Sequence, residues 1–194
     1  MEPVHRREQI LYHASLLFGQ KGYHATSISD IIEAAGIARG TFYLYFKNKR
    51  SIFSEILDEL VVQIQRCIRK IELSDDAPPV EEQIVANVTG VVELLTTNRA
   101  LLSILLEGAV GLDKGFAERL FVFYEQIAVT VDKSLSLGQE MGLLRPCNSR
   151  TAALTAIGAL KEVLYDALRR NAQIDDIENM VSELLDIYLH GVAS

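Results

Sequence analysis

The sequence predicts an all-α protein of about nine helices. Apolar residues recur at helical spacing through most of the chain, and no segment shows the alternating pattern of a strand. Breaks that contain proline, glycine or asparagine separate the apolar stretches. The 194 residues suit one or two domains with a substantial core. We expect a three-helix N-terminal domain over residues 1–50 and a helical C-terminal domain over residues 51–194.

The first two expected helices are short and close together. One apolar face defines the first helix, and it consists of Ile10, Leu11, Ala14, Leu17 and Phe18. The second helix follows Thr26 and Ser27, whose hydroxyls suit an N-cap. Ser27 and Asp30 have the spacing of a capping box. Gly36 comes at the end of this helix, where a left-handed backbone favours glycine.

The third expected helix opens at Ala38 and Arg39, directly after this glycine. Two helices joined by so short a turn form a helix-turn-helix unit. Phe42 and Phe46 are four residues apart and can both be buried. The remaining side chains cannot all face the core, and they are Arg39, Gly40, Thr41, Tyr43 and Tyr45. Hydroxyls can donate to phosphate oxygens, and arginine can bond a guanine edge, so this surface suits a DNA duplex.

The fourth expected helix spans about residues 48–71, with Asn48 as its N-cap. Three cations surround its start, Lys47, Lys49 and Arg50. A helix N-terminus beside cations attracts phosphate. The proline-bearing segment from Asp75 to Pro79 cannot continue a helix. Further helices are expected over about 80–97, 99–110, 116–140, 150–170 and 175–190.

Charge divides unevenly along the chain, whose formal net charge is −7. Residues 1–50 hold seven Lys/Arg and four Asp/Glu, which gives +3. Residues 51–194 hold twelve and twenty-two, which gives −10. The basic charge therefore coincides with the helix-turn-helix segment, and the acidic remainder favours an orientation that turns this segment towards DNA.

The segment from Ile10 to Leu57 resembles the DNA-binding domain of the tetracycline-repressor (TetR/AcrR) family of bacterial transcriptional regulators. The resemblance includes Phe18, Gly22 and Tyr23, then T-S-I-x-D-I from Thr26 to Ile31. It continues with A-G-I from Ala35 to Ile37 and G-T-F-Y-x-Y-F-K-x-K from Gly40 to Lys49. Arg39 stands where lysine is frequent in the family, and Leu44 stands where histidine is frequent. These departures keep the docking mode and leave the base preference open.

The resemblance implies a set of DNA contacts. Arg39 and Gly40 would approach bases, and Ser29 would face the groove. The implied phosphate contacts are Thr26 or Ser27, with Thr41, Tyr43 and Lys49. The hydroxyl of Tyr45 is a further candidate from its own chemistry. We expect no cofactor for this role. We also expect no metal site, because the four histidines have no metal-ligand spacing.

For the C-terminal domain the resemblance implies a ligand pocket and a dimer interface. The candidate pocket residues are Val88, Val91, Val92, Leu95, Leu102, Leu105, Leu106, Phe121, Tyr124 and Ile127. Apolar residues at helical spacing are also what an ordinary core contains, so both interpretations stay open. An apolar pocket favours a hydrophobic or amphipathic small-molecule effector. Residues 150–170 and 175–190 of two subunits would form a homodimer, although the same residues can close the subunit's own core.

The sequence therefore predicts a homodimeric DNA-binding regulator, a repressor that binds a palindromic operator and is released by a ligand. The alternative is a DNA-bound protein of the same fold that answers to a protein partner or to no ligand. An enzyme is not expected, because the chain has no phosphate-binding loop or nucleophile motif. No apolar run is long enough for a membrane span. The N-terminus lacks the apolar core of a signal peptide, so we expect a cytoplasmic protein without membrane partners.

Overall fold

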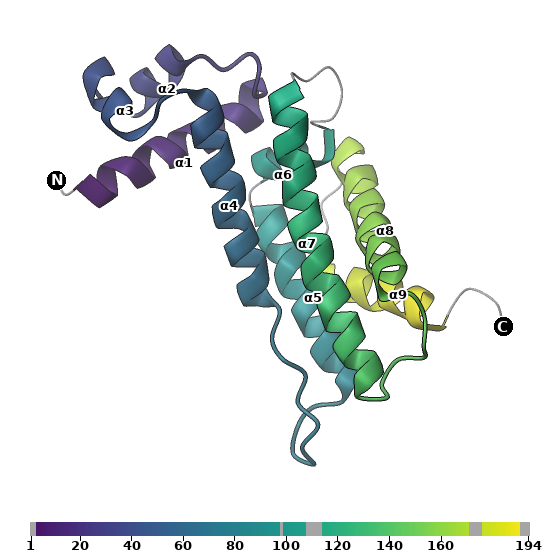
Figure 1. The fold of residues 1–194 in the computed structure, drawn as a ribbon. Helices are drawn as coiled ribbons and strands as arrows, with labels where there is room; N and C mark the ends of the chain where they lie inside the picture. The colour runs from purple at the N-terminus through teal and green to yellow at the C-terminus, as the bar shows by residue number, and fades with distance from the viewer. Residues whose placement is uncertain (1–2, 98, 108–113, 171–175, 191–194) are drawn as a thin grey trace. The chain divides into compact units, whose positions relative to one another are not determined.

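The structure is a computed structural model that describes residues 3–97, 99–107, 114–170 and 176–190 (Figure 1). These ranges hold nine helices and no strand, which confirms the all-α prediction. The helices are α1 (Pro3–Lys21), α2 (Ile28–Ala34), α3 (Arg39–Tyr45), α4 (Lys49–Cys67), α5 (Val80–Thr97), α6 (Arg99–Glu107), α7 (Lys114–Glu140), α8 (Ser149–Arg169) and α9 (Ile177–His190). Within the described ranges, no helix is both long enough and apolar enough to cross a membrane.

Helix α4 ends at Cys67, four residues before the predicted end. The backbone after it is held by carboxamide side chains of α5 instead of by helical hydrogen bonds. Asn87 donates to the carbonyl of Arg69 at 2.9 Å and accepts from its amide at 3.0 Å. Gln83 makes the same pair of bonds with Glu72, both at 2.9 Å. Because these side chains satisfy the backbone polar groups, the segment has no need to remain helical.

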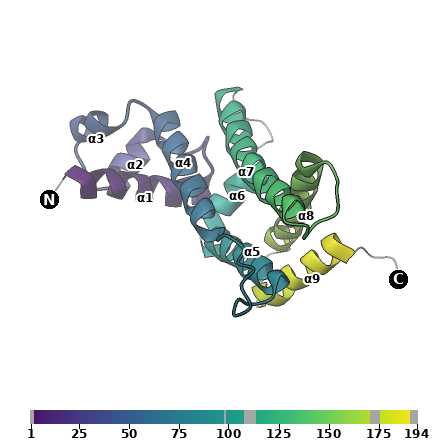
Figure 2. The same ribbon diagram turned by 60° about the horizontal axis from the view of Figure 1, so that its bottom comes forward.

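The described residues form two compact units, one over residues 1–61 and 95–123 and the other over 62–94 and 124–194. The predicted domain boundary at residue 50 stays a prediction. In the first unit α1 packs against α2 and α6, and α2 packs against α3 (Figures 1 and 2).

The core of the first unit contains a cluster of aromatic rings from α1, α4, α7 and the loop after α1. The rings of Phe53 and Phe116 are stacked, with centroids 4.3 Å apart. The centroid of the Tyr23 ring lies 4.5 Å from that of Phe116 and 5.2 Å from that of Phe18. Arg119 of α7 also donates to the carbonyl of Ser54 at 3.1 Å. The start of α7 is therefore part of the same core as α1 and α4.

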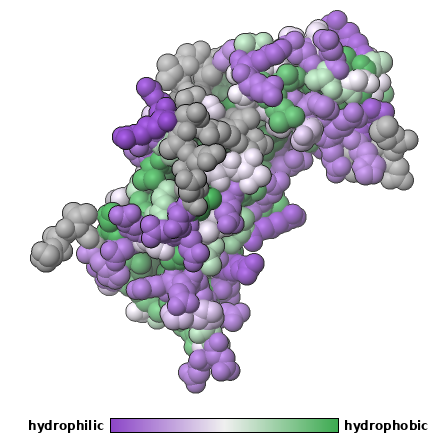
Figure 3. All heavy atoms as spheres, turned by 180° about the vertical axis from the view of Figure 1, so that it is seen from behind, coloured by the Kyte–Doolittle hydropathy of each residue, from purple (hydrophilic) through white to green (hydrophobic). Residues whose placement is uncertain are grey.

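The second unit is joined by polar bonds between its helices. The hydroxyl of Tyr188 on α9 donates to the carbonyl of Ala152 on α8 at 2.9 Å. Arg150 of α8 pairs with Glu125 of α7 at 2.5 Å. Leu154 on α8 remains half exposed. On the face drawn in Figure 3, green hydrophobic side chains reach the surface at several places among hydrophilic ones.

Replacing Phe116 with alanine tests the aromatic core. The ring is fully buried, so Phe116→Ala is expected to lower the free energy of unfolding by about 3–5 kcal/mol in a denaturant titration. The matched control is Phe121→Ala on the same helix, whose side chain is 69 % exposed. The control should change stability by no more than about 0.5 kcal/mol. Equal losses for the two variants would contradict this packing.

Candidate nucleic-acid interface

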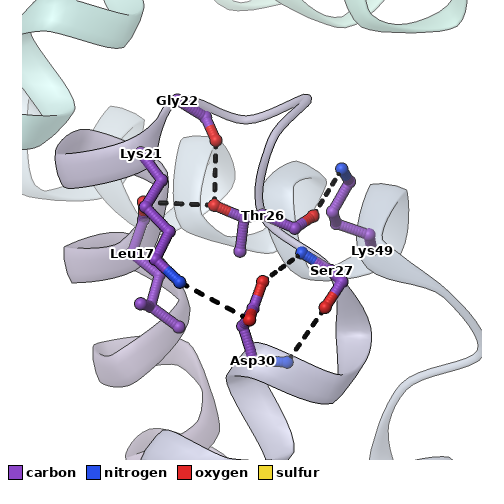
Figure 4. A network of polar contacts seen from close by, with 7 residues as sticks. All are labelled: Leu17, Lys21, Gly22, Thr26, Ser27, Asp30 and Lys49. Atoms are coloured by element: carbon purple, nitrogen blue, oxygen red, sulfur yellow. Dashed lines mark hydrogen bonds and ion pairs between the residues drawn. The ribbon is translucent and has the colours of Figure 1, made fainter.

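Helix α2 begins with a complete capping box. The Ser27 side chain accepts from the Asp30 amide at 3.1 Å, and the Asp30 carboxylate accepts from the Ser27 amide at 2.8 Å (Figure 4). Lys21 of α1 lies 3.5 Å from the same carboxylate. The Ser27 hydrogen bonds lower the pKa of Asp30 most, and the Lys21 charge lowers it further. The predicted capping box is confirmed, and Asp30 stays ionised at the positive end of the helix.

The Thr26 side chain faces inward and not towards a phosphate. It is 1 % exposed, and its Oγ1 lies 2.8 Å from the carbonyl oxygen of Gly22 and 3.1 Å from that of Leu17 (Figure 4). A hydroxyl has one proton, and these two acceptors at the end of α1 compete for it. The expectation that Thr26 contacts DNA through its side chain is therefore corrected. Ser27 is exposed and retains that assignment as a prediction.

The Lys49 ammonium is also turned inward. Its Nζ donates to the carbonyls of Tyr23 at 2.5 Å, Thr26 at 2.8 Å and His24 at 3.3 Å. It lies 4.4 Å from the centre of the Tyr23 ring. An ammonium group has three donors, and these three carbonyls occupy them. The expectation that Lys49 holds a phosphate is corrected, because its side chain fixes the loop between α1 and α2.

Helix α3 is anchored by two buried aromatic side chains. Phe42 and Phe46 lie in the core, as their spacing predicts. Arg39, Gly40 and Tyr43 of the same helix are exposed. The Arg39 guanidinium lies 6.0 Å from the centre of the Tyr43 ring, one turn further along. The helix thus exposes the guanidinium of Arg39, the hydroxyl of Tyr43 and the backbone of Gly40, which has no side chain to cover it.

The other predicted contact residues lie near this surface to different degrees. Ser29 on α2 is exposed, whereas Thr41 and Tyr45 on α3 are half-buried. All of them remain predictions as DNA contacts.

Arg7 of α1 is paired with Glu55 of α4 and lies 5.4 Å from the centre of the Phe46 ring. Burial raises the pKa of Glu55, and the charge of Arg7 opposes that rise.

A groove of about 510 Å³ opens between the starts of α2 and α4. Its lining includes the exposed side chains of Ser27, Asn48 and Arg50. Asn48 accepts from the Ser51 amide at 2.9 Å, so it is the predicted N-cap of α4. Hydroxyl, carboxamide and guanidinium groups beside a helix N-terminus can receive an anion such as a backbone phosphate.

The ten candidate pocket residues differ in burial. Val92, Leu102 and Leu105 are buried, Phe121 is exposed, and the rest are half-buried. Burial raises the pKa of Tyr124 to about 12, so its hydroxyl is neutral at physiological pH. The Lys161 ammonium lies 5.0 Å from the centre of that ring. The residues belong to both compact units, and the ligand pocket stays a prediction.

The inward-facing side chain of Lys49 can be tested by comparing two lysines. Lys49→Ala removes three hydrogen bonds from a charged donor and should lower the free energy of unfolding by about 1–3 kcal/mol. Lys47→Ala removes the same charge from an exposed position nearby, and it should change stability by no more than about 0.5 kcal/mol. Denaturant titration of both variants measures the difference. Equal stability of the two variants would show that the Lys49 contacts do not stabilise the loop.

Comparison with known proteins finds a family match for the N-terminal segment. Residues 10–56 match the family model described as bacterial regulatory proteins, tetR family. The uncharacterised HTH-type transcriptional regulator YhgD of Bacillus subtilis is 23 % identical over 186 residues, which cover 96 % of this chain and 95 % of that protein.

Solved structures of regulators share the fold over almost the whole chain. The fatty acid degradation regulator FadR from Bacillus halodurans has a TM-score of 0.81 and 24 % identity, with 99 % of this chain and 97 % of that chain covered. The transcriptional regulator FadR from Bacillus subtilis, in complex with stearoyl-CoA, has a TM-score of 0.78 and 22 % identity. This match covers 96 % of this chain and 99 % of the Bacillus subtilis FadR chain. The chain therefore resembles transcriptional regulators of the TetR family: residues 10–56 match the family model, and the relative and the solved structures that match almost the whole chain are regulators.

Proposed function

We propose that this protein is a repressor that binds a palindromic operator as a homodimer and leaves it when a small molecule binds. The observation that carries the proposal is the exposed face of α3. Arg39, Gly40 and Tyr43 are exposed there, and the buried side chains of Phe42 and Phe46 hold the helix in place. A short helix fixed in this way can enter the major groove of B-DNA, which is wide enough for a helix.

The exposed and half-buried groups of α2 and α3 divide by chemistry into two kinds of contact. Arg39 has the fork of donors that matches a guanine edge, and Gly40 lets the backbone come close to the bases. Ser29 lies on α2 and would face the same groove. The hydroxyls that would donate to phosphate oxygens belong to Ser27, Thr41, Tyr43 and Tyr45. Phosphate contacts set the position on the duplex, and base contacts set the sequence.

A homodimer supplies the symmetry that a palindromic operator needs. Helices α8 and α9 are the proposed interface, because Leu154 and Ile187 leave apolar surface exposed on them. Recognition helices of such dimers lie about 34–36 Å apart, one turn of DNA. A molecule that changes this separation would weaken the binding of the dimer to both half-sites at once.

The proposed effector is hydrophobic or amphipathic and binds among the helices of residues 80–140. The apolar character of the candidate pocket residues supports this class. The Bacillus subtilis FadR structure is a complex with stearoyl-CoA, so a long-chain acyl thioester is the first compound to test. A preference of about 100-fold for the released state, or about 2.7 kcal/mol, would suffice for a useful switch.

Two substitutions on α3 test the DNA contacts on a duplex selected from a random pool. Arg39→Ala should relax base preference at one position per half-site, with a loss of about 1–3 kcal/mol of discrimination. Tyr43→Phe removes one phosphate donor and should weaken binding by about 0.5–1.5 kcal/mol on every sequence. Arg66→Ala and Tyr12→Phe change exposed residues outside α2 and α3 and serve as controls. Unchanged affinity and base preference in both α3 variants would defeat the assignment.

Stearoyl-CoA is expected to raise the thermal midpoint of the protein and to release the selected duplex. A ligand that binds only the folded state stabilises it by about 2.7 kcal/mol at 100 times its Kd. Coenzyme A without the acyl chain is the control, and it should leave both readings unchanged. If only highly charged compounds act, the hydrophobic class is wrong. If no compound in a metabolite panel acts on a protein that binds the duplex, control by a protein partner or by none replaces this proposal.

A further inference from the structure

Leu44 is the most exposed large apolar side chain reported among the described residues, with 82 % of its surface exposed. It lies on α3, beside Tyr43, which is 46 % exposed. A leucine in this position contributes almost nothing to the core, since burial is the source of its stabilising effect. Leu44 is the exposed aliphatic side chain on the helix that faces the proposed duplex.

Helical geometry places Leu44 in the middle of that face. Successive residues of an α-helix turn by about 100°, so Gly40 and Leu44 lie almost directly opposite Phe42. Phe42 is fully buried, which points Gly40 and Leu44 straight outward. A Cβ built on Gly40 would meet nothing within 4 Å, so the surface one turn before Leu44 is open. Arg39 and Tyr43 flank this line on one side, and Thr41 and Tyr45 flank it on the other.

We propose that Leu44 is a specificity-determining residue that contacts the 5-methyl group of a thymine in the major groove. This inference rests on the proposed function. The side chain has no donor, no acceptor and no charge, so it cannot bond a phosphate or a polar base edge. The thymine methyl is the apolar group that the major groove presents. Apolar contact with that methyl distinguishes thymine from cytosine, and it requires no hydrogen bond.

The spacing on α3 locates the thymine relative to the base that Arg39 reads. Leu44 follows Arg39 by five residues, which corresponds to about 7.5 Å along the helix axis. Base pairs of B-DNA are stacked about 3.4 Å apart. A helix that lies along the groove therefore places the thymine about two base pairs from the position that Arg39→Ala relaxes.

Replacing thymine by uracil in the selected duplex tests the contact, because it removes the methyl and keeps every hydrogen-bonding group of the base. One symmetric thymine position should lose affinity for the wild-type protein by about fourfold per half-site when it carries uracil. Leu44→Ala should bind the original duplex with the same loss and should not distinguish thymine from uracil there. Leu44→Met keeps an apolar side chain and should retain the preference. Leu73→Ala, at an exposed leucine outside the DNA-binding helices, is the matched control and should behave as wild type.

The outcomes separate this inference from the function on which it rests. If the random pool yields no enriched duplex, the proposed function fails and the thymine contact fails with it. If a duplex is enriched but uracil is tolerated at every thymine, the contact alone is overturned. A uracil effect that persists unchanged in Leu44→Ala also overturns it, since another residue then reads the methyl. The thermal midpoint of Leu44→Ala should equal that of wild type, because the side chain is exposed.

Discussion

One ammonium group fixes the relative positions of three helices in the DNA-binding segment. The Lys49 side chain comes from the first turn of α4, and the carbonyls it bonds belong to the loop that joins α1 to α2. The backbone of that loop leads directly to the Ser27 cap, so the start of α2 is positioned by a residue more than twenty positions later. Because α2 packs against α3, the orientation of the exposed face of α3 depends on this contact.

The polar side chains around this contact are of two kinds: some bond the backbone of the loop and of α2, and others are exposed on α3. Thr26 and Lys49 donate to backbone carbonyls at the end of α1 and in the loop that follows it, and Asp30 accepts from the Ser27 amide at the start of α2. Carbonyls and amides left without partners in a partly buried loop would destabilise it. The exposed side chains of α3 are therefore not needed for folding.

Local patterns in the sequence were sufficient for the helices and their caps. The capping box of Ser27 and Asp30 and the N-cap at Asn48 involve residues three apart, and the spacing of Phe42 and Phe46 identified the buried side of α3. The roles of Thr26 and Lys49 and the end of α4 depend on partners 4 to 26 residues away, which no local pattern reveals. The candidate pocket residues could not be separated from core residues, because both kinds of position require the same apolar side chains.

The stacking of Phe116 on Phe53 makes the order of synthesis matter. A ribosome releases α1 to α4 well before residue 116, so the nascent N-terminal helices lack one ring of their own aromatic core. Phe53 and Tyr23 then present apolar surface until α7 arrives to cover it. The helix-turn-helix segment of this chain thus reaches its final packing only after more than half of the protein has been made.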